Sequence, residues 1–355
     1  MPELPSEDLD LICAATRHLW EEARGHRFFF TGGTGFFGIW LLESFLEANR
    51  RFKLNAEAVV LTRDPERFFR KCPHLKDNSV LSFHTGDVRS FDFPSGRFEY
   101  VIHAATEASA KLSSEQPLEM LSTILDGTKR TLEFARHCGA RKFLLTSSGA
   151  VYGPQPPDIS HIEEAYIGAP DCLDPASVYG EGKRTAELMC VLYSKYFEVK
   201  IARCFAFVGP HLPLDAHFAI GNFIRDALAG GPIVIKGDGT PKRSYLYAAD
   251  LAIWLWTVLF LGKSCRPYNV GSAEAISIGE LAHLVRRSIA PNVDVSISGN
   301  TTFVSPLTQY LPEIRRAEEE LGLSQRIALS EALAKTAGWH CACERVTPGS
   351  TSPSF

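Results

Sequence analysis

The stretch RFFFTGGTGFFG, residues 27–38, decides the fold of this chain. Its three leading phenylalanines predict a buried strand, and the apolar periodicity of the residues that follow predicts a helix directly after the glycines. Gly32 permits a tight turn, Gly35 lets a pyrophosphate approach the backbone, and Gly38 lets helix and strand pack closely. The free N–H groups and the dipole at the helix start favour an anion. This strand–turn–helix context predicts a binding site for a nicotinamide dinucleotide.

Strand and helix patterns alternate on the carboxyl side of this stretch. Residues 113–138 and 177–196 carry the periodicity of helices, and short apolar runs between them predict strands. Strands that alternate with helices build a parallel sheet covered on both faces. We therefore expect an α/β fold, with strands at residues 28–31, 58–61, 80–83, 100–105, 142–146 and 199–202.

The segments that flank this alternation have other patterns. Before it, apolar residues from Leu9 to Trp20 recur at helical spacing and predict an amphipathic helix that packs on the body. After it, residues 205–245 are rich in glycine and proline, and residues 246–271 resemble a return to the main sheet. The polar residues 341–355 predict a disordered tail.

The composition of the 355-residue chain excludes several functional classes. A net charge of −4 provides no broad basic field for nucleic acid. The longest apolar run, residues 251–262, is far shorter than the roughly 20 residues that cross a bilayer, so we expect no membrane segment. Nine scattered cysteines without a CxxC pair indicate reduced thiols and a cytoplasmic protein. Histidines and cysteines show no metal-ligand spacing, so we expect no metal, and His103 is expected to pack near the cofactor strand.

The end of the second predicted strand bears on which nicotinamide cofactor binds. An acidic side chain there binds the adenosine ribose of NAD, whereas a basic one accommodates the 2′-phosphate of NADP. The sequence reads Leu61-Thr62-Arg63-Asp64. Thr62 and Arg63 stand where the acid commonly lies, which favours NADP, while Asp64 keeps NAD open.

A tyrosine, a lysine and a serine form the candidate catalytic group. Tyr179 and Lys183 are four positions apart on a predicted helix and therefore share one face. The Lys183 ammonium is expected to lower the pKa of the Tyr179 phenol from about 10, which would make the phenol a base near neutral pH. Ser148 follows the fifth predicted strand, where parallel sheets place their chemistry, and its hydroxyl is placed to hydrogen-bond the reacting oxygen.

Taken together, these motifs resemble the extended short-chain dehydrogenase/reductases. The resemblance rests on GGTGFFG at 32–38, GDV at 86–88, HAA at 103–105, SSGAVYG at 147–153 and YGEGK at 179–183. Three later motifs are similar to those of sugar-nucleotide epimerases and dehydratases: RCFAFVGP at 203–210, GDGTPKRSYLYAADLA at 237–252 and YNVGS at 268–272. The resemblance covers residues 27–340.

The resemblance implies a Rossmann fold, a doubly wound parallel sheet with a smaller C-terminal α/β substrate domain. It also implies a bound NAD or NADP, a nucleoside-diphosphate sugar as substrate, and a homodimer through the helices near residues 113–137 and 179–195. The expected division of the chain is residues 1–26 as an N-terminal helical extension, 27–204 as the cofactor domain with 246–271 returning to it, 205–245 and 272–340 as the substrate-binding region, and 341–355 as the tail.

Residue roles follow from the same resemblance. Tyr179 would take the proton of the sugar C4 hydroxyl while hydride leaves for the nicotinamide, Ser148 would hydrogen-bond that oxygen, and Lys183 would hold the ribose. Arg203 and Arg243 are candidates for the substrate phosphates, with a structural ion pair as the alternative for each. The implied cofactor-binding residues are Gly32, Thr34, Gly35, Phe36, Phe37, Gly38, Thr62, Arg63, Asp87, Val88, Ala104, Ala105, Thr106, Tyr179 and Lys183.

Two departures from the family pattern bear on the reaction. The 4,6-dehydratases carry an Asp-Glu pair before VYG, and related decarboxylases keep the glutamate, whereas this chain has Gly149 and Ala150, which cannot move a proton. Elimination would then need another group, such as Glu163 or Glu164. The asparagine of the family motif RxxNxxG is replaced by Ala206, so substrate contacts are expected from the segment 213–222, with Asn222 and His217 as its polar candidates.

We therefore favour epimerisation of a nucleotide sugar by transient C4 oxidation, because it needs no acid beyond Tyr179. A 4,6-dehydratase with relocated acid and base groups and a 4-ketoreductase that consumes NADPH remain alternatives. A cofactor-sensing protein without turnover is disfavoured, since Ser148, Tyr179 and Lys183 are all present.

Overall fold

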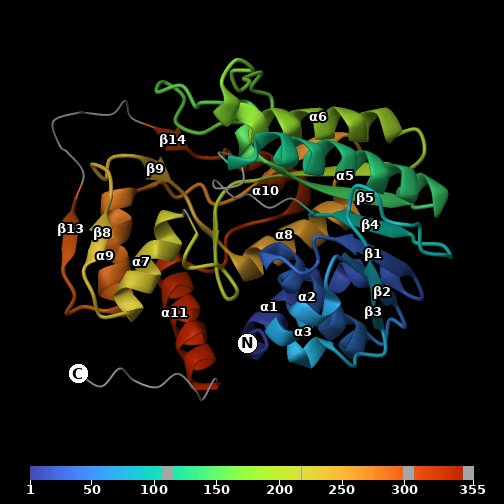
Figure 1. The fold of residues 1–355 in the computed structure, drawn as a ribbon, viewed down its shortest axis with the longest axis horizontal. Coiled ribbons are helices and arrows are strands. Elements are labelled where there is room, and N and C mark those ends of the chain that lie inside the picture. The colour runs from blue at the N-terminus through green and yellow to red at the C-terminus, as the bar shows by residue number, and fades with distance from the viewer. Residues whose placement is uncertain (106–114, 217, 299–307, 347–355) are drawn as a thin grey trace.

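The computed structural model describes residues 1–105, 115–216, 218–298 and 308–346. Within these residues a seven-stranded parallel sheet, ordered β11-β6-β5-β4-β1-β2-β3, forms the centre of the molecule (Figure 1). The chain winds from β1 outward to β3, returns to β4 beside β1, and winds the other way, which confirms the doubly wound α/β fold. The strands are Arg27–Thr31 (β1), Glu57–Thr62 (β2), Leu81–Thr85 (β3), Tyr100–His103 (β4), Lys142–Ser148 (β5), Glu198–Cys204 (β6) and Arg266–Val270 (β11).

Helices cover both faces of this sheet, and β1 shows why. Phe28 and Phe30 belong to one core cluster and Phe29 to another, because successive strand residues point to opposite faces. Both faces are therefore apolar, as a parallel sheet between helices requires. The helices α5 (Pro117–His137) and α6 (Val178–Tyr193) lie side by side on the Phe29 face (Figure 1). The opposite face is covered by α2 (Phe36–Phe52) and α8 (Ala248–Leu261).

The apolar run at residues 251–262 lies almost entirely in α8, which is buried from Ala248 to Phe260. The helix passes beneath the sheet and leads into β11, which pairs with β6 in parallel. Residues 246–271 thus rejoin the central sheet. Among the described residues, no helix is both long enough and apolar enough to cross a membrane.

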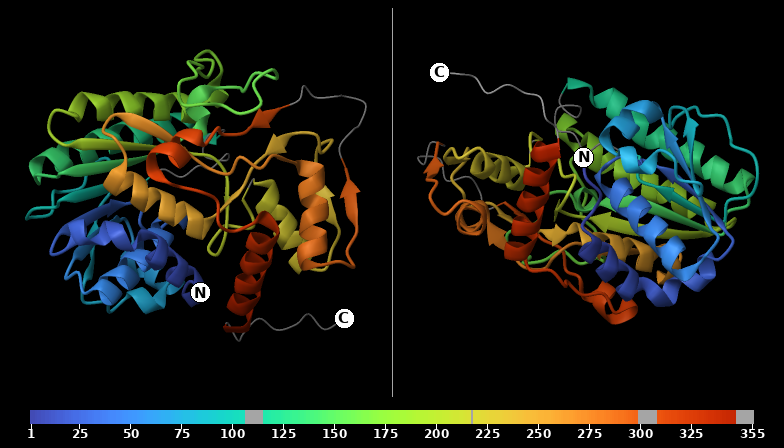
Figure 2. Two further views of the ribbon diagram at one scale, coloured as in Figure 1. Left: turned by 180° about the vertical axis from the view of Figure 1, so that it is seen from behind. Right: turned by 90° about the horizontal axis from the view of Figure 1, so that it is seen from below.

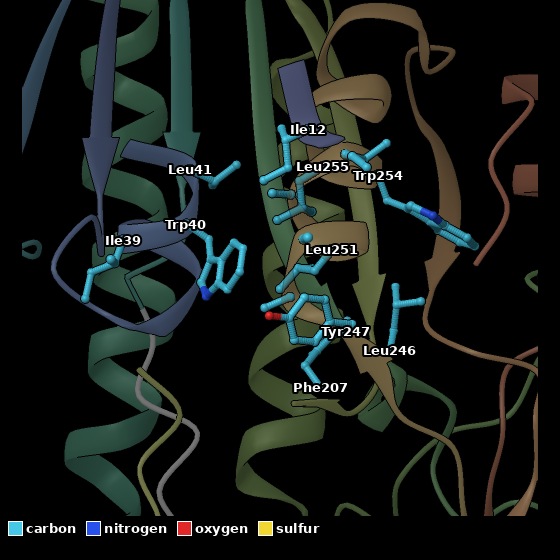
Figure 3. Packing of buried hydrophobic residues seen from close by; sticks show 14 of the residues in the cluster. Ile12, Ile39, Trp40, Leu41, Phe207, Leu246, Tyr247, Leu251, Trp254 and Leu255 are labelled. Atoms are coloured by element: carbon cyan, nitrogen blue, oxygen red, sulfur yellow. The ribbon is translucent and has the colours of Figure 1, made fainter. Parts of the chain in front are cut away.

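The amino-terminal segment folds as the amphipathic pattern predicts. Helix α1 (Ser6–Thr16) continues into a 3₁₀ turn, Arg17–Ala23, and the two bury Ile12, Leu19 and Trp20. The Trp20 ring lies 4.8 Å from that of Trp256 in α8. Figure 3 shows Ile12 in the same apolar cluster as residues of α2 and α8, so this segment is part of the core.

The chain after β6 builds a smaller region beside the carboxyl ends of the strands. It contains short sheets β10-β7, β12-β9-β14 and β13-β8, with α7 and α9 packed on each other (Figure 2). Its elements are Phe207–Val208 (β7), Ala219–Leu228 (α7), Ile233–Ile235 (β8), Lys242–Arg243 (β9), Leu246–Tyr247 (β10), Ile276–Ser277 (β12), Ile278–Ile289 (α9), Val295–Ile297 (β13), Gln309–Tyr310 (β14), Arg315–Leu321 (α10) and Leu329–Val346 (α11). The remaining elements are Pro65–Lys71 (α3) and the 3₁₀ turns Pro73–Leu75, Gly149–Tyr152 and Pro175–Ser177.

Two boundaries differ from the sequence prediction. The tail expected from residue 341 begins later, because α11 continues to Val346; its buried face, which includes Leu333 and Trp339, holds the helix against the body. Residues 347–355 lie outside the described residues. Helix α5 begins at Pro117, since proline is favoured in a first turn, and residues 106–114 of the predicted helical region are likewise outside the described part.

Candidate active site

The glycine turn between β1 and α2 has the close contacts that the sequence predicted. Gly32 has a φ of +72°, and a Cβ there would lie 2.3 Å from the Ala104 carbonyl oxygen. A Cβ on Gly38 would lie 2.4 Å from the Gly32 carbonyl oxygen, so helix and turn touch through backbone alone. Gly35 forms the N-cap of α2 without a side-chain hydrogen bond, and it is exposed. The uncapped helix start leaves N–H groups free for a pyrophosphate, so the turn fits a dinucleotide.

The other predicted residues of the turn divide between surface and core. Thr34 is half-buried, whereas Phe36 and Phe37 pack their rings against the core, Phe37 at 5.1 Å from Phe207. Both side chains are half-buried, and their backbone amides lie in the first turn of α2, so their cofactor contact stays a prediction. Ala104 and Ala105 follow β4 directly beside Gly32, and both are half-buried. Thr106 lies outside the described residues.

The predicted adenosine end of the site is formed by the residues after β2 and β3. Asp64 caps α3 by accepting a hydrogen bond from the Arg67 amide at 2.9 Å, and Arg63 is exposed beside it. Thr62 ends β2 and is half-buried. Asp87 accepts hydrogen bonds from the Arg89 guanidinium at 2.8 and 3.0 Å, which lowers the pKa of its carboxyl. Val88 packs against α5: a Cβ added to Gly127 of that helix would lie 3.0 Å from the Val88 side chain.

The structure brings Ser148, Tyr179 and Lys183 together at the carboxyl end of β5. Ser148 is the last residue of β5, and its Oγ accepts a hydrogen bond from the Ala150 amide at 3.1 Å. The Ser148 hydroxyl also acts on Tyr179, where it partly lowers the pKa of the phenol. Lys183 lies one helical turn after Tyr179 in α6, and its Nζ donates to the Thr146 carbonyl oxygen at 2.8 Å. β5 pairs in parallel with β4, and β4 with β1. This group therefore lies at the same carboxyl end of the sheet as the glycine turn.

The pKa prediction for Tyr179 is wrong for this arrangement. Burial raises the pKa of the phenol to about 12, and the Ser148 hydrogen bond lowers it only in part. The Lys183 ammonium lies 5.9 Å from the ring centre and is directed to the Thr146 carbonyl, so it does not offset the burial. Burial also lowers the pKa of Lys183 to about 8. Desolvation of both groups outweighs their mutual attraction.

A second phenol, which the sequence analysis does not predict, lies at this centre. The hydroxyl of Tyr310, in β14, is 3.4 Å from Ser148 Oγ. β14 pairs in parallel with β9, which places Tyr310 in register with Arg243. Tyr179 and Tyr310 are separated in sequence by most of the predicted substrate region. Only the pairing of two-residue strands brings Tyr310 to this centre, so no local motif predicts its position.

Three predicted substrate contacts have different environments. The Arg203 guanidinium binds both oxygens of Glu187, at 2.7 and 3.0 Å, and also donates to the Tyr152 hydroxyl at 3.0 Å. Arg203 thus forms the structural ion pair that was its alternative, and its phosphate role stays a prediction. Arg243 is half-buried beside Tyr310 and donates to the Thr308 carbonyl oxygen at 3.4 Å. Asn222 lies on α7 and accepts from Arg225 at 3.1 Å.

The candidate replacement acids lie in other environments. Glu164 is buried, accepts a hydrogen bond from the Asn269 amide at 2.8 Å and lies 3.5 Å from Arg316, and burial raises the pKa of its carboxyl. Glu163 is exposed and lines a surface pocket with His161. Neither is among the hydrogen-bond partners of Ser148 in the described structure. His217 lies outside the described residues.

His103 has the structural role that the sequence predicted. Its ring nitrogens contact the hydroxyls of Thr31 at 2.7 Å and Thr128 at 3.0 Å, and burial lowers its pKa to about 3. Within the described chain, no group of three or more His, Cys, Asp or Glu side chains is arranged to hold a metal ion.

Comparisons with known proteins agree with this geometry. UDP-glucuronic acid decarboxylase 6 of Arabidopsis thaliana is 30% identical over 309 residues, which cover 86% of this chain and 86% of the relative. UDP-glucuronic acid decarboxylase 1 of Xenopus tropicalis is 32% identical over 240 residues, 67% of this chain and 56% of the relative.

Two solved structures share the fold. The UDP-N-acetylglucosamine 4-epimerase of Methanobrevibacter ruminantium M1 superposes with a TM-score of 0.77 at 20% identity, covering 90% of this chain and 99% of that chain. The dTDP-glucose 4,6-dehydratase of Streptomyces venezuelae, with NAD bound, has a TM-score of 0.76 at 23% identity and covers 91% and 99%. The family model described as the NAD dependent epimerase/dehydratase family matches residues 29–271. This chain therefore belongs to the NAD dependent epimerase/dehydratase family.

Proposed function

We propose that this enzyme epimerises a nucleoside-diphosphate sugar by transient oxidation at C4. The observation that carries the proposal is the meeting of Ser148, Tyr179 and Lys183 at the sheet edge that also holds the glycine turn. Its relatives act on UDP-glucuronic acid, and structures with its fold include 4-epimerases. C4 oxidation is the first step that such reactions share.

Each residue of this group has a distinct task in that step. A bound nicotinamide would supply the hydride acceptor, and the glycine turn with the uncapped start of α2 would hold its pyrophosphate. Tyr179 removes the proton of the C4 hydroxyl while the C4–H electron pair leaves as hydride. Ser148 hydrogen-bonds the same oxygen. Lys183, one turn further along α6, would hold the cofactor ribose, and the positive charge of an oxidised nicotinamide would lower the Tyr179 pKa that burial raises. Return of the proton and hydride to the other face of the sugar gives the epimer without net change of cofactor.

The residues after Ser148 favour epimerisation over elimination or decarboxylation. Positions 149 and 150 carry glycine and alanine, so no side chain there can protonate a leaving hydroxyl or act at C5. Of the alternatives, Glu164 is bound to the Asn269 amide and lies beside Arg316, and Glu163 is exposed at a surface pocket. An epimerase needs only a base and a hydrogen-bond donor at C4, and this centre supplies both.

The substrate phosphates and the cofactor phosphate are assigned to different arginines. Arg243, in register with Tyr310, is placed to bind the diphosphate of the sugar nucleotide. We assign NADP as the preferred cofactor, because Asp64 is committed to the α3 cap while Arg63 is exposed at the ribose end. Arg63→Ala should weaken NADP binding at least tenfold and leave NAD binding unchanged in calorimetry. A stronger loss for NAD would reverse this assignment.

A 4-ketoreductase is the second candidate, and the Arg63 environment favours it. A net reductase must exchange its cofactor after each turnover, and NADPH is the usual reductant for biosynthesis. The same three residues would serve, with Tyr179 as the acid. This reaction oxidises one NADPH for each 4-keto sugar that is reduced, whereas an epimerase leaves the cofactor unchanged.

One experiment separates these functions. The enzyme is incubated with UDP-glucose, UDP-glucuronic acid or dTDP-glucose, with NAD or NADP, and products are followed by NMR and absorbance at the nicotinamide band. We expect a 4-epimer without net reduction of cofactor, and loss of the activity in Tyr179→Phe but not in Tyr166→Phe. A 4-keto-6-deoxy sugar or release of CO₂ would contradict the proposal. Stoichiometric NADPH oxidation with a supplied 4-keto nucleotide sugar would establish the reductase instead.

A homodimer through α5 and α6 completes the proposal. Leu188, Val191 and Leu192 form an exposed apolar stripe on α6, and Leu118 at the start of α5 is 81% exposed. Apolar side chains at this helical spacing fit a helix pair from a second copy. Leu188→Glu should convert a dimer to a monomer in light scattering, and a wild-type monomer would contradict this part. The nine cysteines all lie among the described residues and form no disulfide there, which suits a reducing compartment, so we propose a cytoplasmic location.

A further inference from the structure

The space beside Ser148 is filled by the side chains of Phe205 and Tyr310, which are distant from Ser148 in sequence. A Cβ on Gly149 would lie 2.7 Å from the Tyr310 hydroxyl and 2.7 Å from the Phe205 ring. Real Cβ atoms do not approach other atoms so closely, so these two aromatic residues occupy the position that any side chain at 149 would take. This packing therefore requires glycine at position 149, which is also a position where the 4,6-dehydratases carry an acidic residue.

Tyr310 is held in this position by its neighbours. Its ring lies 4.6 Å from that of Phe205, with an interplanar angle of 36°. Backbone pairing of β14 with β9 fixes its strand, and the Leu311 amide donates to the Gln155 side chain at 2.9 Å. The hydroxyl that results is 3.4 Å from Ser148 Oγ, within reach of the oxygen that Ser148 would bind in a substrate.

We propose that Tyr310 is a further catalytic residue, whose hydroxyl donates a hydrogen bond to the sugar C4 oxygen together with Ser148. This inference rests on the proposed function. Tyr310 transfers no proton; it stabilises the oxygen as the C4–H electron pair leaves, while the hydroxyl proton goes to Tyr179. A preorganised donor at such an oxygen acts most strongly in a water-excluded site.

The positions of the two phenols suit this division of work, since burial raises the pKa of both. Burial raises the pKa of Tyr310 well above its ordinary value, so at neutral pH it remains a donor. Tyr179 is one helical turn from Lys183, whose ammonium lies 5.9 Å from the Tyr179 ring centre, whereas the ring of Tyr310 packs on Phe205. Tyr310 therefore keeps its proton through the cycle, and Tyr179 exchanges its own.

Removal of the hydroxyl alone tests this role. Tyr310→Phe keeps the ring that packs on Phe205, so the fold should be retained, and we expect kcat to fall on the order of 100-fold. The KM for the sugar nucleotide and the affinity for the cofactor should change less than threefold. The primary isotope effect with 4-deuterated UDP-glucose should rise, because hydride transfer becomes slower; a merely structural role would not raise it. Tyr166→Phe, a matched loss of a hydroxyl near Tyr152, should leave all of these values unchanged.

The contact with Gly149 provides an independent check. Gly149→Ala should displace the Tyr310 hydroxyl and reduce kcat about as much as Tyr310→Phe, and the double variant should be little worse than either. Wild-type kcat and isotope effect in Tyr310→Phe would overturn this inference while the proposed function stands. Lack of any C4 chemistry in the wild-type enzyme, with each supplied nucleotide sugar, would overturn the proposed function itself.

Discussion

Arg203 and Glu187 form a two-point ion pair behind the active site, with Nη2–Oε2 at 2.7 Å and Nε–Oε1 at 3.0 Å. Their side chains are only 14% and 11% exposed. Ser147 donates to the same carboxylate at 2.5 Å, so the pair ties α6 and β6 to the residue directly before Ser148. The pair therefore positions the strand end that carries the reacting group.

Loss of one partner of this pair should destabilise the fold. Glu187→Gln leaves the Arg203 charge buried, so we expect the free energy of unfolding to fall by about 3 kcal/mol or more in urea titrations. Glu181→Gln on the same helix is the control, because its ion pair with Arg184, at 3.9 Å, is exposed and should contribute about 1 kcal/mol or less. Wild-type stability in Arg203→Ala, with a KM for UDP-glucose raised more than tenfold, would instead restore its predicted phosphate role.

Two glycines of the turn should respond differently to alanine. A Cβ on Gly35 meets only the Gly32 carbonyl oxygen, at 3.4 Å, so Gly35→Ala should fold normally but weaken NADP binding more than tenfold by crowding the pyrophosphate. A Cβ on Gly38 lies 2.4 Å from three backbone atoms, so Gly38→Ala should lower the melting temperature by several degrees. Calorimetry with NADP and thermal unfolding measure the two effects. Unchanged NADP affinity in Gly35→Ala would place the pyrophosphate elsewhere.

The sequence predicted most of the sheet because the signals there are local. The six strands expected from apolar runs all occur, and Gly32 with Gly38 marks a turn whose backbone contacts exclude side chains. Ser148 and Tyr179 were also predictable, since each follows directly from an adjacent strand or helix. The return of the chain through α8 to the sheet could be anticipated from its apolar length alone.

The remaining parts of the site depend on contacts between distant segments. Tyr310 reaches Ser148 only through two-residue strands, which carry no period that a pattern can detect. Arg203 has the same sequence signature whether it binds phosphate or Glu187, and the outcome depends on the position of Glu187 in helix α6. The direction of the Tyr179 pKa shift was missed because burial, which the sequence does not measure, outweighs the Lys183 charge.

The amino-terminal helix should be required for stability. Trp20 is buried, its indole donates to the Thr16 hydroxyl at 2.9 Å, and its ring contacts those of Phe45, Trp256 and Phe260. Trp20→Ala should lower the free energy of unfolding by about 3–5 kcal/mol, because it leaves a large cavity between α2 and α8. His18→Ala, on the exposed side of the same turn, should have no effect in the same urea titration. Equal stability of the two variants would show that this segment is dispensable.

We expect the burial of His211 to make the stability of the protein sensitive to acid. Its side chain is fully buried, packs 4.3 Å from the Trp339 ring, and neither ring nitrogen has a hydrogen-bond partner in the described structure. Glu43, at 4.0 Å, is the nearest carboxylate, and Lys71 and His74 add positive charge nearby. Burial, with these charges, lowers the pKa of His211 to about 2.

The sign of the pH effect follows from this shift. The folded state requires neutral His211, so its contribution is complete above the unfolded pKa near 6.5 and is lost as pH falls from there toward 2. At pH 5 the loss amounts to about 2 kcal/mol. His211→Phe should therefore reduce the difference in unfolding free energy between pH 7.5 and pH 5 by about that amount, measured in urea, whereas His18→Phe on the surface should leave the difference unchanged. Taking the difference between the two pH values within each variant cancels any packing cost of the larger ring. If His211→Phe left this difference unaltered, protonated His211 would have to gain a hydrogen-bond acceptor in the folded state at low pH.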